Sequence, residues 1–368
     1  MYYKDFKGEK ISALGFGLLR LPTIPDSSDI VDKEKAAEII DCAIKNGVNY
    51  FDTAHNYLGG NSERAAGEIL ARYPRESYYL ATKYSPSYRK PIEEVFETQL
   101  KSLQTDHFDF YLLHSIQEEN LETYLQLKEK LLGFLMRKKE EGRIKYLGFS
   151  SHSAPEVLKK FLDSCGGCFD MALIQLNYVD WFALRAKEQY EILTERGIPV
   201  WVMEPLKGGR LSALDEESSG ILKTAAPHRS VSSWGMRFLM GLPNVQTVLS
   251  GMTELPQVKD NLATFEKYDP LSEAERDALE RARRIFVEKL GVPCSACRYC
   301  CDPCPAGLDI PLLIRGYNEE KTVGDPWRVE GLSNTKGAEY CLQCGACAKQ
   351  CPQKIDIPGV MREPQKKK

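Results

Sequence analysis

Cysteines recur at one spacing in two stretches of the chain, VPCSACRYCCDPCP at 292–305 and EYCLQCGACAKQCP at 339–352. Each member of the first set has a counterpart 47 residues later (341 − 294 = 47), and each stretch ends in Cys-Pro. Thiolates are soft ligands that suit iron–sulfur clusters or zinc. Chance does not produce this repeat, so the sequence predicts that eight thiols bind metal: Cys294, Cys297, Cys300, Cys304, Cys341, Cys344, Cys347 and Cys351.

The spacing separates these two kinds of metal site. A four-thiolate zinc site needs only two C-x2-C pairs. Here a third cysteine follows after two more residues, and a fourth stands before a proline, in both stretches. The pattern C-x2-C-x2-C-x3-C-P is typical of bacterial two-cluster ferredoxins, in which the fourth cysteine binds the other cluster. We therefore expect two 4Fe–4S clusters, with zinc as the alternative.

Ligation of that crossed kind predicts two sets of ligands, one of Cys294, Cys297, Cys300 and Cys351 and the other of Cys304, Cys341, Cys344 and Cys347. Cys301 is surplus, and a spare thiol beside the cluster is the simpler interpretation, although its spacing to Cys304 would permit a ligand exchange. The 36 residues between Cys304 and Cys341 contain IPLLIRGYNEE, which is typical of a helix. A small, mainly helical ferredoxin-like domain is expected.

The whole chain, at 368 residues, has room for one large domain and one small one. Its hydrophobic content of 43% suits a globular core, and its net charge of −3 gives no general attraction to nucleic acid or to an anionic membrane. No apolar run approaches the roughly 18 residues of a membrane span, and charges occupy the N-terminus where a signal peptide is apolar. We expect a cytoplasmic protein, in which cysteines favour metal or redox chemistry over disulfides. The remaining three are expected to be structural: Cys42, Cys165 and Cys168.

Strand-like and helix-like segments alternate before the cysteine-rich region. Short β-branched or aromatic runs occur eight times, at 13–18, 48–53, 78–83, 109–114, 145–150, 172–177, 199–204 and 246–251. Amphipathic helices are clearest at 33–46, 91–104 and 254–266. Eight strand–helix units predict an α/β fold, the (β/α)8 TIM barrel, over residues 1–285, followed by the ferredoxin-like domain over 286–368. A doubly wound dinucleotide-binding sheet is disfavoured, because Gly15-Phe16-Gly17 does not continue into G-x-G-x-x-G.

Polar residues end several of these strands, at the rim where TIM barrels carry their active sites. Asp52, Lys83 and His114 end the second, third and fourth strands, and Tyr57 follows Asp52 by five residues. Each residue alone has an ordinary structural explanation, such as a buried ion pair or a strand-end histidine. Together on one rim they favour a proton-transfer site, and the same rim would carry Ser150, Gln175 and Glu204.

The chain resembles the aldo/keto reductase superfamily over residues 8–268. The matching stretches follow in that family's order: NYFDTAHNYLGGNSE, YYLATK, FDFYLLH, GRIKYLGFSSH, IQLNY, EPLKGGRL and VLSGMTELPQVKDNL. In that family an Asp, a Tyr, a Lys and a His are catalytic, and the resemblance implies this role for Asp52, Tyr57, Lys83 and His114. It also implies a nicotinamide cofactor, NADP(H) or NAD(H), bound across the barrel mouth without a Rossmann motif.

Carbonyl reduction needs a hydride at carbon and a proton at oxygen. An unperturbed tyrosine, with a pKa of about 10, is a poor acid near neutral pH. A lysine ammonium about 4 Å away attracts the phenolate by about 4 kcal/mol at an effective dielectric of about 20, which would bring the phenol close to working pH. Lys83 is thus expected to activate Tyr57, and Asp52 to keep Lys83 charged. His114 would orient the carbonyl oxygen or join the proton relay.

The resemblance assigns eight more residues to the cofactor. Ser150, Ser151 and Gln175 match positions that hold the nicotinamide amide, Leu206 and Gly208 match the loop over the pyrophosphate, and Gly251, Gln257 and Asn261 match the adenosine end. Ser151 stands where that family usually has asparagine, and Met203 where many members stack a tyrosine. Gly251 and Gln257 replace basic residues that often grip a 2′-phosphate, so the choice between NADPH and NADH stays open.

These patterns predict an oxidoreductase that transfers hydride between NAD(P)H and a carbonyl or alcohol substrate, with an appended two-cluster electron-transfer module. A redox partner protein would exchange single electrons with the clusters. A nicotinamide moves two electrons together and each cluster moves one, so either an undetected cofactor or partner protein intervenes, or the clusters are structural or sensory. No flavin site that could divide the pair is recognisable in the sequence. The alternatives are an electron-transfer protein that uses the barrel as a docking scaffold, and a reductase whose tail binds zinc for folding. An intact catalytic set argues against the scaffold.

Overall fold

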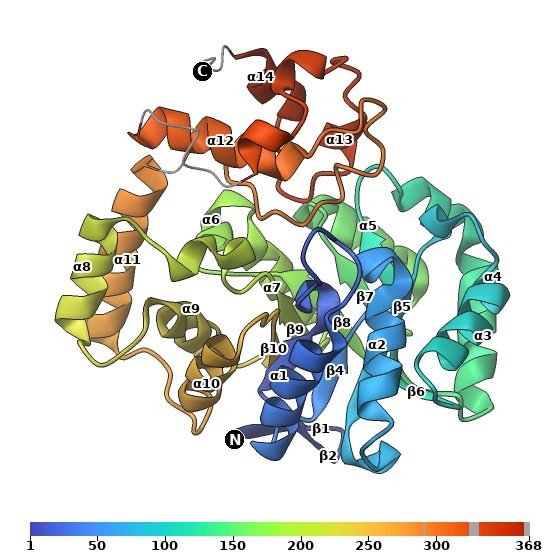
Figure 1. Ribbon diagram of the computed structural model, residues 1–368. Helices are drawn as coiled ribbons and strands as arrows, with labels where there is room; N and C mark the ends of the chain where they lie inside the picture. The colour runs from blue at the N-terminus through green and yellow to red at the C-terminus, as the bar shows by residue number, and fades with distance from the viewer. Residues whose placement is uncertain (290, 324–330, 364–368) are drawn as a thin grey trace. The chain divides into compact units, whose positions relative to one another are not determined.

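Strands and helices alternate along most of the chain in the computed structural model, which describes residues 1–289, 291–323 and 331–363. Within these residues, eight parallel strands pair in the order β10-β3-β4-β5-β6-β7-β8-β9 and close into a barrel (Figure 1). Their bounds are β3 Leu14–Gly17, β4 Tyr50–Asp52, β5 Tyr79–Tyr84, β6 Phe108–Ile116, β7 Ile144–Ser151, β8 Met171–Gln175, β9 Val200–Met203 and β10 Val245–Ser250. The predicted (β/α)8 fold is confirmed.

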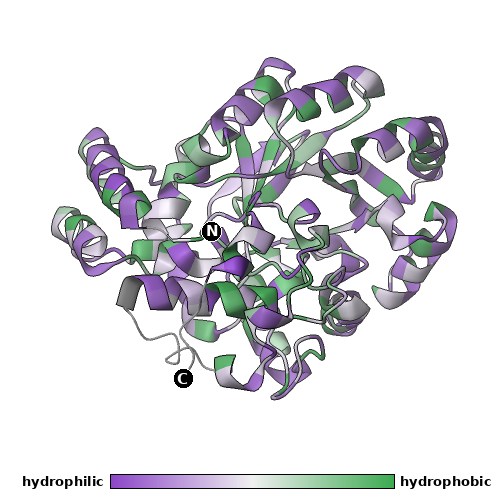
Figure 2. Ribbon diagram, turned by 90° about the horizontal axis from the view of Figure 1, so that it is seen from above, coloured by the Kyte–Doolittle hydropathy of each residue, from purple (hydrophilic) through white to green (hydrophobic). Residues whose placement is uncertain are grey.

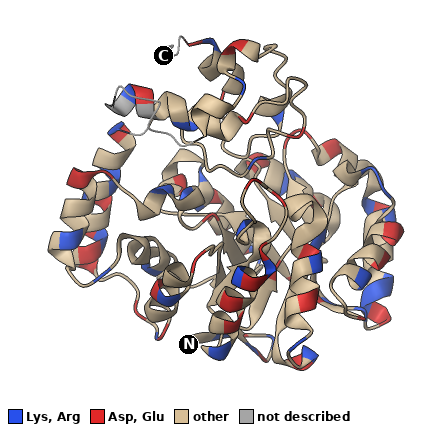
Figure 3. Cartoon of the chain, in the orientation of Figure 1, with Lys and Arg blue, Asp and Glu red and all other residues tan. Residues whose placement is uncertain are grey.

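Helices connect successive strands. Asp32 begins the first of them by accepting a hydrogen bond from the backbone nitrogen of Lys35, and Pro155 opens another. The helices carry hydrophobic and hydrophilic faces (Figure 2), and their acidic and basic residues are interspersed (Figure 3). Their bounds are α1 Lys33–Lys45, α2 Asn61–Leu70, α3 Ile92–Ser102, α4 Leu121–Glu140, α5 Pro155–Cys165, α6 Asp180–Ala183, α7 Ala186–Glu195, α8 Glu216–Ala225, α9 Val231–Met240 and α10 Leu255–Thr264.

Side chains along the strands alternate between the inside of the barrel and the surrounding helices. The inner cluster combines aromatic and aliphatic residues of the strands: Tyr50, Ala81, Phe110, Leu112, Tyr146, Met171, Leu173, Trp201 and Leu249. A β-hairpin adds to this cluster, formed by β1 Tyr3–Phe6 and β2 Glu9–Ser12. Its Phe6 is buried, with its ring centroid 4.9 Å from that of Tyr146 and 5.0 Å from that of Trp201.

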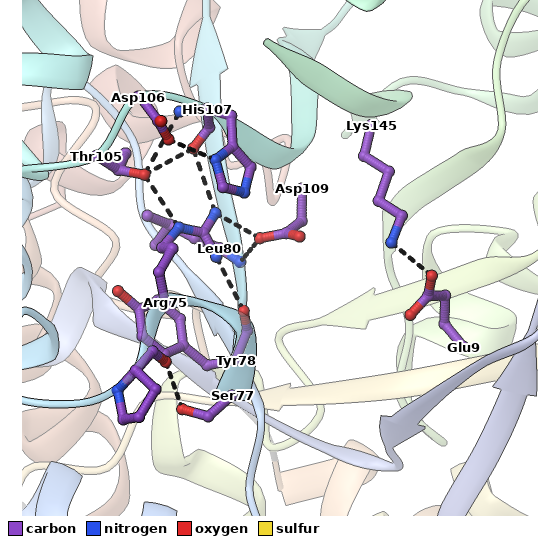
Figure 4. A network of polar contacts seen from close by, with 11 residues as sticks. Glu9, Arg75, Ser77, Tyr78, Leu80, Thr105, Asp106, His107, Asp109 and Lys145 are labelled. Carbon is purple, nitrogen blue, oxygen red and sulfur yellow. Dashed lines mark hydrogen bonds and ion pairs between the residues drawn. The ribbon is translucent and has the colours of Figure 1, made fainter. Parts of the chain in front are cut away.

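A polar network lies where β5 and β6 begin (Figure 4). Arg75 donates to a carboxylate oxygen of Asp109 at 2.6 Å and to the carbonyl oxygen of Tyr78 at 3.0 Å. The same oxygen of Asp109 accepts a hydrogen bond from the backbone nitrogen of Leu80 at 2.9 Å. These bonds tie the loop before β5 to β6, at the end of the barrel that serves stability in this fold.

The chain divides into two compact units. The first holds Met1–Pro205 and Ser232–Ser272 and contains the barrel. The second holds Leu206–Val231 and Glu273–Lys368, so that α8 and α11 Glu273–Lys289 belong to it, and these two helices pack together. The domain boundary at residue 285 stays a sequence-based proposal, since the packing also places the segment after β9 in the second unit.

The cysteine-rich part of the second unit contains α12 Ile310–Val323, α13 Ala346–Lys349 and α14 Ile357–Arg362. Its helical character, including the helix expected in IPLLIRGYNEE, is as predicted. The core joins three buried cysteines to aliphatic residues: Cys300, Leu308, Ile310, Leu313, Ile314, Leu332, Ala338, Cys347, Cys351, Ile355, Ile357 and Met361. Among the helices in the described ranges, none is both long and apolar enough to cross a membrane.

Candidate active site and candidate cluster-binding cysteines

Three of the predicted catalytic residues lie on the inner face of the barrel, where their strands end. Each stands two residues after a member of the inner cluster: Asp52 after Tyr50, Lys83 after Ala81, and His114 after Leu112. Since the side chains of a strand repeat their direction every second residue, all three project inward. The parallel register pairs Asp52 with Ala81 and Lys83 with Leu112, so neighbouring strands stagger the three groups.

The structure brings the four predicted catalytic residues together. Lys83 Nζ donates to Asp52 Oδ1 at 2.5 Å and to the carbonyl oxygen of Thr53 at 2.6 Å. The same nitrogen lies 4.8 Å from the centroid of the Tyr57 ring. The rings of Tyr57 and His114 meet edge to face at an interplanar angle of 72°, with centroids 5.7 Å apart.

A strained turn holds Tyr57 in this position. The residue begins the short 3-10 segment Tyr57–Gly60, in which Leu58 has φ 50° and Gly59 φ 59°. Gly60, at φ 83°, is the N-cap residue that precedes α2. Left-handed backbone is readily adopted by glycine but not by leucine, so the two glycines permit a turn that leaves Tyr57 only 8% exposed.

Burial sets the charge states of this group. Burial lowers the pKa of Lys83, and the negative charge of Asp52 opposes that shift. Burial likewise raises the pKa of Asp52 against the attraction of Lys83. For His114, burial and then the charge of Lys83 hold the pKa well below the usual value for histidine. A neutral imidazole at neutral pH follows, which can orient a carbonyl but does not act as a cationic acid.

Tyr88 is a site residue that the sequence reasoning missed. Its hydroxyl lies 2.7 Å from His114 Nδ1, and the hydroxyl of Tyr124 donates to the carbonyl oxygen of His114 at 2.6 Å. Tyr88 follows Lys83 by five residues, as Tyr57 follows Asp52. That repeated offset, a tyrosine on the loop after a polar strand end, is the signal that could have found it.

The residues that are predicted to hold the nicotinamide lie in the first unit, where β7 and β8 end. Ser150 Oγ accepts from the backbone nitrogen of Ser115 at 2.7 Å. The amide of Gln175 is fixed on both sides, since Nε2 donates to Asp180 at 2.8 Å and Oε1 lies 3.1 Å from His152 Nδ1. Ser151, which is fully buried, instead bonds to Ser153 Oγ at 2.8 Å.

The residues predicted for the adenosine end have structural partners too. Gln257 Oε1 accepts from the backbone nitrogen of Thr253 at 2.8 Å and helps to cap α10, and Asn261 donates to Ser250 Oγ at 3.0 Å. A Cβ on Gly251 would lie 3.1 Å from the side chain of Arg20. A basic residue that the sequence did not predict for the adenosine end is therefore next to Gly251. Leu206 and Gly208 belong to the second unit.

Two separate hollows in the second unit divide the eight cysteines of the repeat. One is lined by Cys294, Cys297, Cys300 and Cys351, and the other by Cys304, Cys341, Cys344 and Cys347. In each hollow three thiols come from one stretch and the fourth from the other, as crossed ligation requires. Cys301 lines neither. Over the described residues, no three His, Cys, Asp or Glu side chains converge closely enough to hold a single metal ion.

The early cysteines have ordinary surroundings. Cys165 ends α5 and is buried, and the two glycines that follow it take φ 65° and 76° in a turn. Burial raises the pKa of the Cys165 thiol to about 12 and also raises that of Cys168. The helix end and the glycine turn suit a structural role for both thiols.

Comparisons with known proteins identify the families of both parts of the chain. The model of the aldo/keto reductase family matches residues 13–284, and that of a 4Fe-4S dicluster domain matches residues 293–356. An uncharacterized oxidoreductase of Bacillus subtilis is 28% identical over 287 residues, covering 68% of this chain and 86% of that protein.

Solved structures show the same fold. The holo form of an aldo-keto reductase from Bacillus halodurans is 27% identical with a TM-score of 0.62, over 77% of this chain and 96% of that one. An aldo/keto reductase from Klebsiella pneumoniae, in complex with NADP and acetate, is 21% identical with a TM-score of 0.59, over 76% of this chain and 93% of that one. The chain is therefore a member of the aldo/keto reductase family of oxidoreductases, with a 4Fe–4S dicluster domain after its barrel.

Proposed function

We propose that this chain reduces a carbonyl compound with a nicotinamide cofactor, or oxidises the corresponding alcohol, at the carboxyl end of its barrel. The observation that carries the proposal is the fully buried ammonium of Lys83, paired with Asp52 and lying 4.8 Å from the ring of Tyr57. An ammonium buried beside a phenol does not serve the packing of a barrel core, but it suits proton donation.

In the reductive direction Tyr57 donates its phenolic proton to the carbonyl oxygen. When bound, NAD(P)H would supply the hydride that the reduction of an aldehyde or ketone to an alcohol needs. The ammonium of Lys83 stabilises the phenolate left behind. Asp52 keeps Lys83 protonated against its burial, and solvent returns a proton to Tyr57 before the next turnover.

His114 orients the carbonyl oxygen. The hydroxyl of Tyr88 lies 2.7 Å from Nδ1, and donation from that hydroxyl is proposed, which would leave the hydrogen of the neutral imidazole on Nε2, toward the substrate. A neutral donor positions the oxygen without competing with Tyr57 for the role of acid.

The proposed cofactor is NADP(H) or NAD(H). Ser150 and Gln175 fit the nicotinamide end, because both lie on the inner face where β7 and β8 end, and their neighbours hold them in place. The NADP complex of the Klebsiella relative supports a nicotinamide dinucleotide. At the proposed adenosine end, the side chain of Arg20 beside Gly251 adds a positive charge. The proposed contacts also include Ser151, Leu206, Gly208, Gln257 and Asn261.

The proposed tail holds two 4Fe–4S clusters that exchange single electrons with a redox partner protein. The division of the cysteines between two hollows supports crossed ligation: Cys294, Cys297, Cys300 and Cys351 for one cluster, and Cys304, Cys341, Cys344 and Cys347 for the other. When bound, such clusters supply one-electron chemistry that the barrel residues lack.

A Tyr57→Phe variant tests the barrel chemistry. We expect it to bind NADPH or NADH as tightly as the wild type, measured by nicotinamide fluorescence, and to lose about 10²–10⁴-fold in carbonyl reduction. Unchanged turnover would remove Tyr57 as the acid. No saturable binding of either cofactor to the wild type would instead favour the docking-scaffold alternative.

Metal analysis of the anaerobically purified chain tests the tail. About eight iron atoms and as much labile sulfide are expected, with a brown colour from absorption near about 400 nm. Zinc without sulfide would support the folding role instead. A screen of carbonyl substrates and electron acceptors on the same sample would then identify the substrate class.

A further inference from the structure

Gln353 carries a buried amide that its protein neighbours satisfy on one side only. The residue follows Cys351-Pro352, is 6% exposed, and lines the same hollow as Cys294, Cys297, Cys300 and Cys351. Its Oε1 accepts a hydrogen bond from Lys207 Nζ at 2.6 Å. Its Nε2 is buried and has no hydrogen-bond partner among the residues that the structure describes. A buried donor left unpaired is destabilising, so this one needs an explanation.

Lys207 is held firmly where it meets Gln353. It begins the 3-10 segment Lys207–Ser212 after β9 and is 2% exposed. The next residue, Gly208, has φ 65°, and a Cβ there would lie 2.0 Å from the carbonyl oxygen of Ser295. Arg210 Nη1 donates to the carbonyl oxygen of Val292 at 2.8 Å. The segment is therefore fastened to the first cysteine stretch, and the ammonium fixes which way the amide of Gln353 points.

The two hollows differ in their polar groups. Besides its cysteines, the first is lined by Ser295, Arg298 and Gln353. In the described part of the chain, the second has only apolar side chains, glycine and proline beside its cysteines, among them Pro305, Leu308, Ile310 and Met361. The unpaired amide thus belongs to one hollow alone.

We propose that Gln353 donates its Nε2–H to a sulfur of the cluster held by Cys294, Cys297, Cys300 and Cys351, and that Lys207 orients this amide and adds its positive charge. A hydrogen bond to sulfur and a nearby cation both stabilise the more negative, reduced state of a cluster. Gln353 then contacts the cluster, Lys207 positions Gln353, and both raise the reduction potential of this cluster and leave that of the other unaffected. This inference rests on the two clusters of the proposed function.

The test is an anaerobic redox titration of the full chain, followed by electron paramagnetic resonance, which reports on each cluster without any turnover. Gln353→Leu removes the amide at similar size. We expect it to lower one of the two midpoint potentials by the equivalent of about tenfold in the reduction equilibrium, about 59 mV for one electron, with the other unchanged. Lys207→Met should move the same potential in the same direction, and Lys207→Arg should restore it.

Gln350→Leu is the matched control, because this glutamine is exposed and stands directly before Cys351. Suppose that Gln353→Leu and Lys207→Met keep their full iron content and that their midpoint potentials move no more than those of the control. That result would overturn the inference and leave the proposed function standing. Should Gln353→Leu lose iron, the result for Lys207→Met decides alone. Zinc in place of iron in the wild type would overturn the inference together with the proposed clusters, whereas the outcome for Tyr57→Phe has no bearing on the potentials.

Discussion

At the scale of single residues, the charge of one buried group determines the acidity proposed for another. Burial lowers the pKa of Lys83, and Asp52 opposes that shift through an ion pair of 2.5 Å. The ammonium form is the one that stabilises the phenolate of Tyr57. The pH range in which Tyr57 works should therefore depend on Asp52, which does not itself exchange a proton with the substrate.

Asp52→Asn removes the carboxylate charge while keeping the shape of the side chain. The pKa of Lys83 should then fall further. In a titration toward alkaline pH, Lys83 would therefore lose its proton at a lower pH than in the wild type. We expect carbonyl reduction to decline at lower pH than in the wild type, in a profile of kcat against pH, and to drop by about 10²–10⁴-fold at neutral pH. Asp106→Asn, at a carboxylate that is 93% exposed, is the control. Coincident alkaline limbs in the two variants would contradict this role.

Tyr88→Phe deletes the hydroxyl that faces His114 Nδ1. Loss of the hydrogen bond to the imidazole, about 1 kcal/mol, should lower kcat/KM for carbonyl reduction by roughly five- to tenfold without weakening cofactor binding. The nitrogen resonances of His114 should shift toward a mixture of tautomers. Tyr84→Phe is the matched control, since that hydroxyl donates to the carbonyl oxygen of Lys90 instead. An unchanged tautomer in Tyr88→Phe would show that another group orients the ring.

The sequence predicts those site residues whose placement depends on strand periodicity alone. Asp52, Lys83 and His114 end recognisable strands, and the period of two brings them to one face. Tyr88 and Gln353 were missed, because each reaches its partner through a turn or a long-range contact that leaves no periodic pattern. The link from Lys207 to Gln353 spans 146 residues, which no local pattern reveals.

At the scale of elements, the eight barrel strands were predictable since each is a short run of apolar residues buried on both faces. The hairpin of β1 and β2 was not, because YKDF and EKIS contain charges and each buries little: Phe6 in one, and Ile11 with Ser12 in the other. Its place is decided by contacts with the inner cluster, not by its own pattern.

Close helix packing makes one glycine indispensable and leaves another free to change. A Cβ on Gly67, in α2, would lie 2.2 Å from the carbonyl oxygen of Ser102, whereas a Cβ on Gly133, in α4, would meet only the end of Arg137 at 3.9 Å. We expect Gly67→Ala to destabilise the fold by about 1–3 kcal/mol through steric conflict with backbone. Gly133→Ala should stabilise it by about 0.5–1 kcal/mol through helix propensity. Urea unfolding of both variants measures the difference, and shifts of the same sign would refute the packing argument.

At the scale of the whole molecule, composition and packing divide the chain differently. Cysteine usage changes near residue 285, which suggests a boundary there. Packing also assigns Leu206–Val231 to the second unit, where α8 meets α11 and Lys289 bonds to Glu217. A domain boundary predicted from composition shows where the amino-acid usage changes. It does not show which earlier segment of the chain packs against the tail.

Removal of iron should affect the two units unequally. The cysteine-rich core includes thiols among few aliphatic side chains, and a core of that size depends on its metal for stability. After anaerobic chelation we expect hydrogen exchange to rise in residues 291–323 and 331–363 and to stay slow in the barrel strands. Equal loss of protection in β5 and β6 would contradict this. The Tyr57→Phe variant, chelated in parallel, is the control because its cysteines are intact.

The fastening of Lys207 and Gly208 has a consequence for how such a protein could arise. A gene cut at residue 285 would leave an ammonium without its amide acceptor and a turn without the carbonyl it abuts. A substitute tail would therefore need an acceptor for the ammonium of Lys207 and a backbone that fits closely against Gly208.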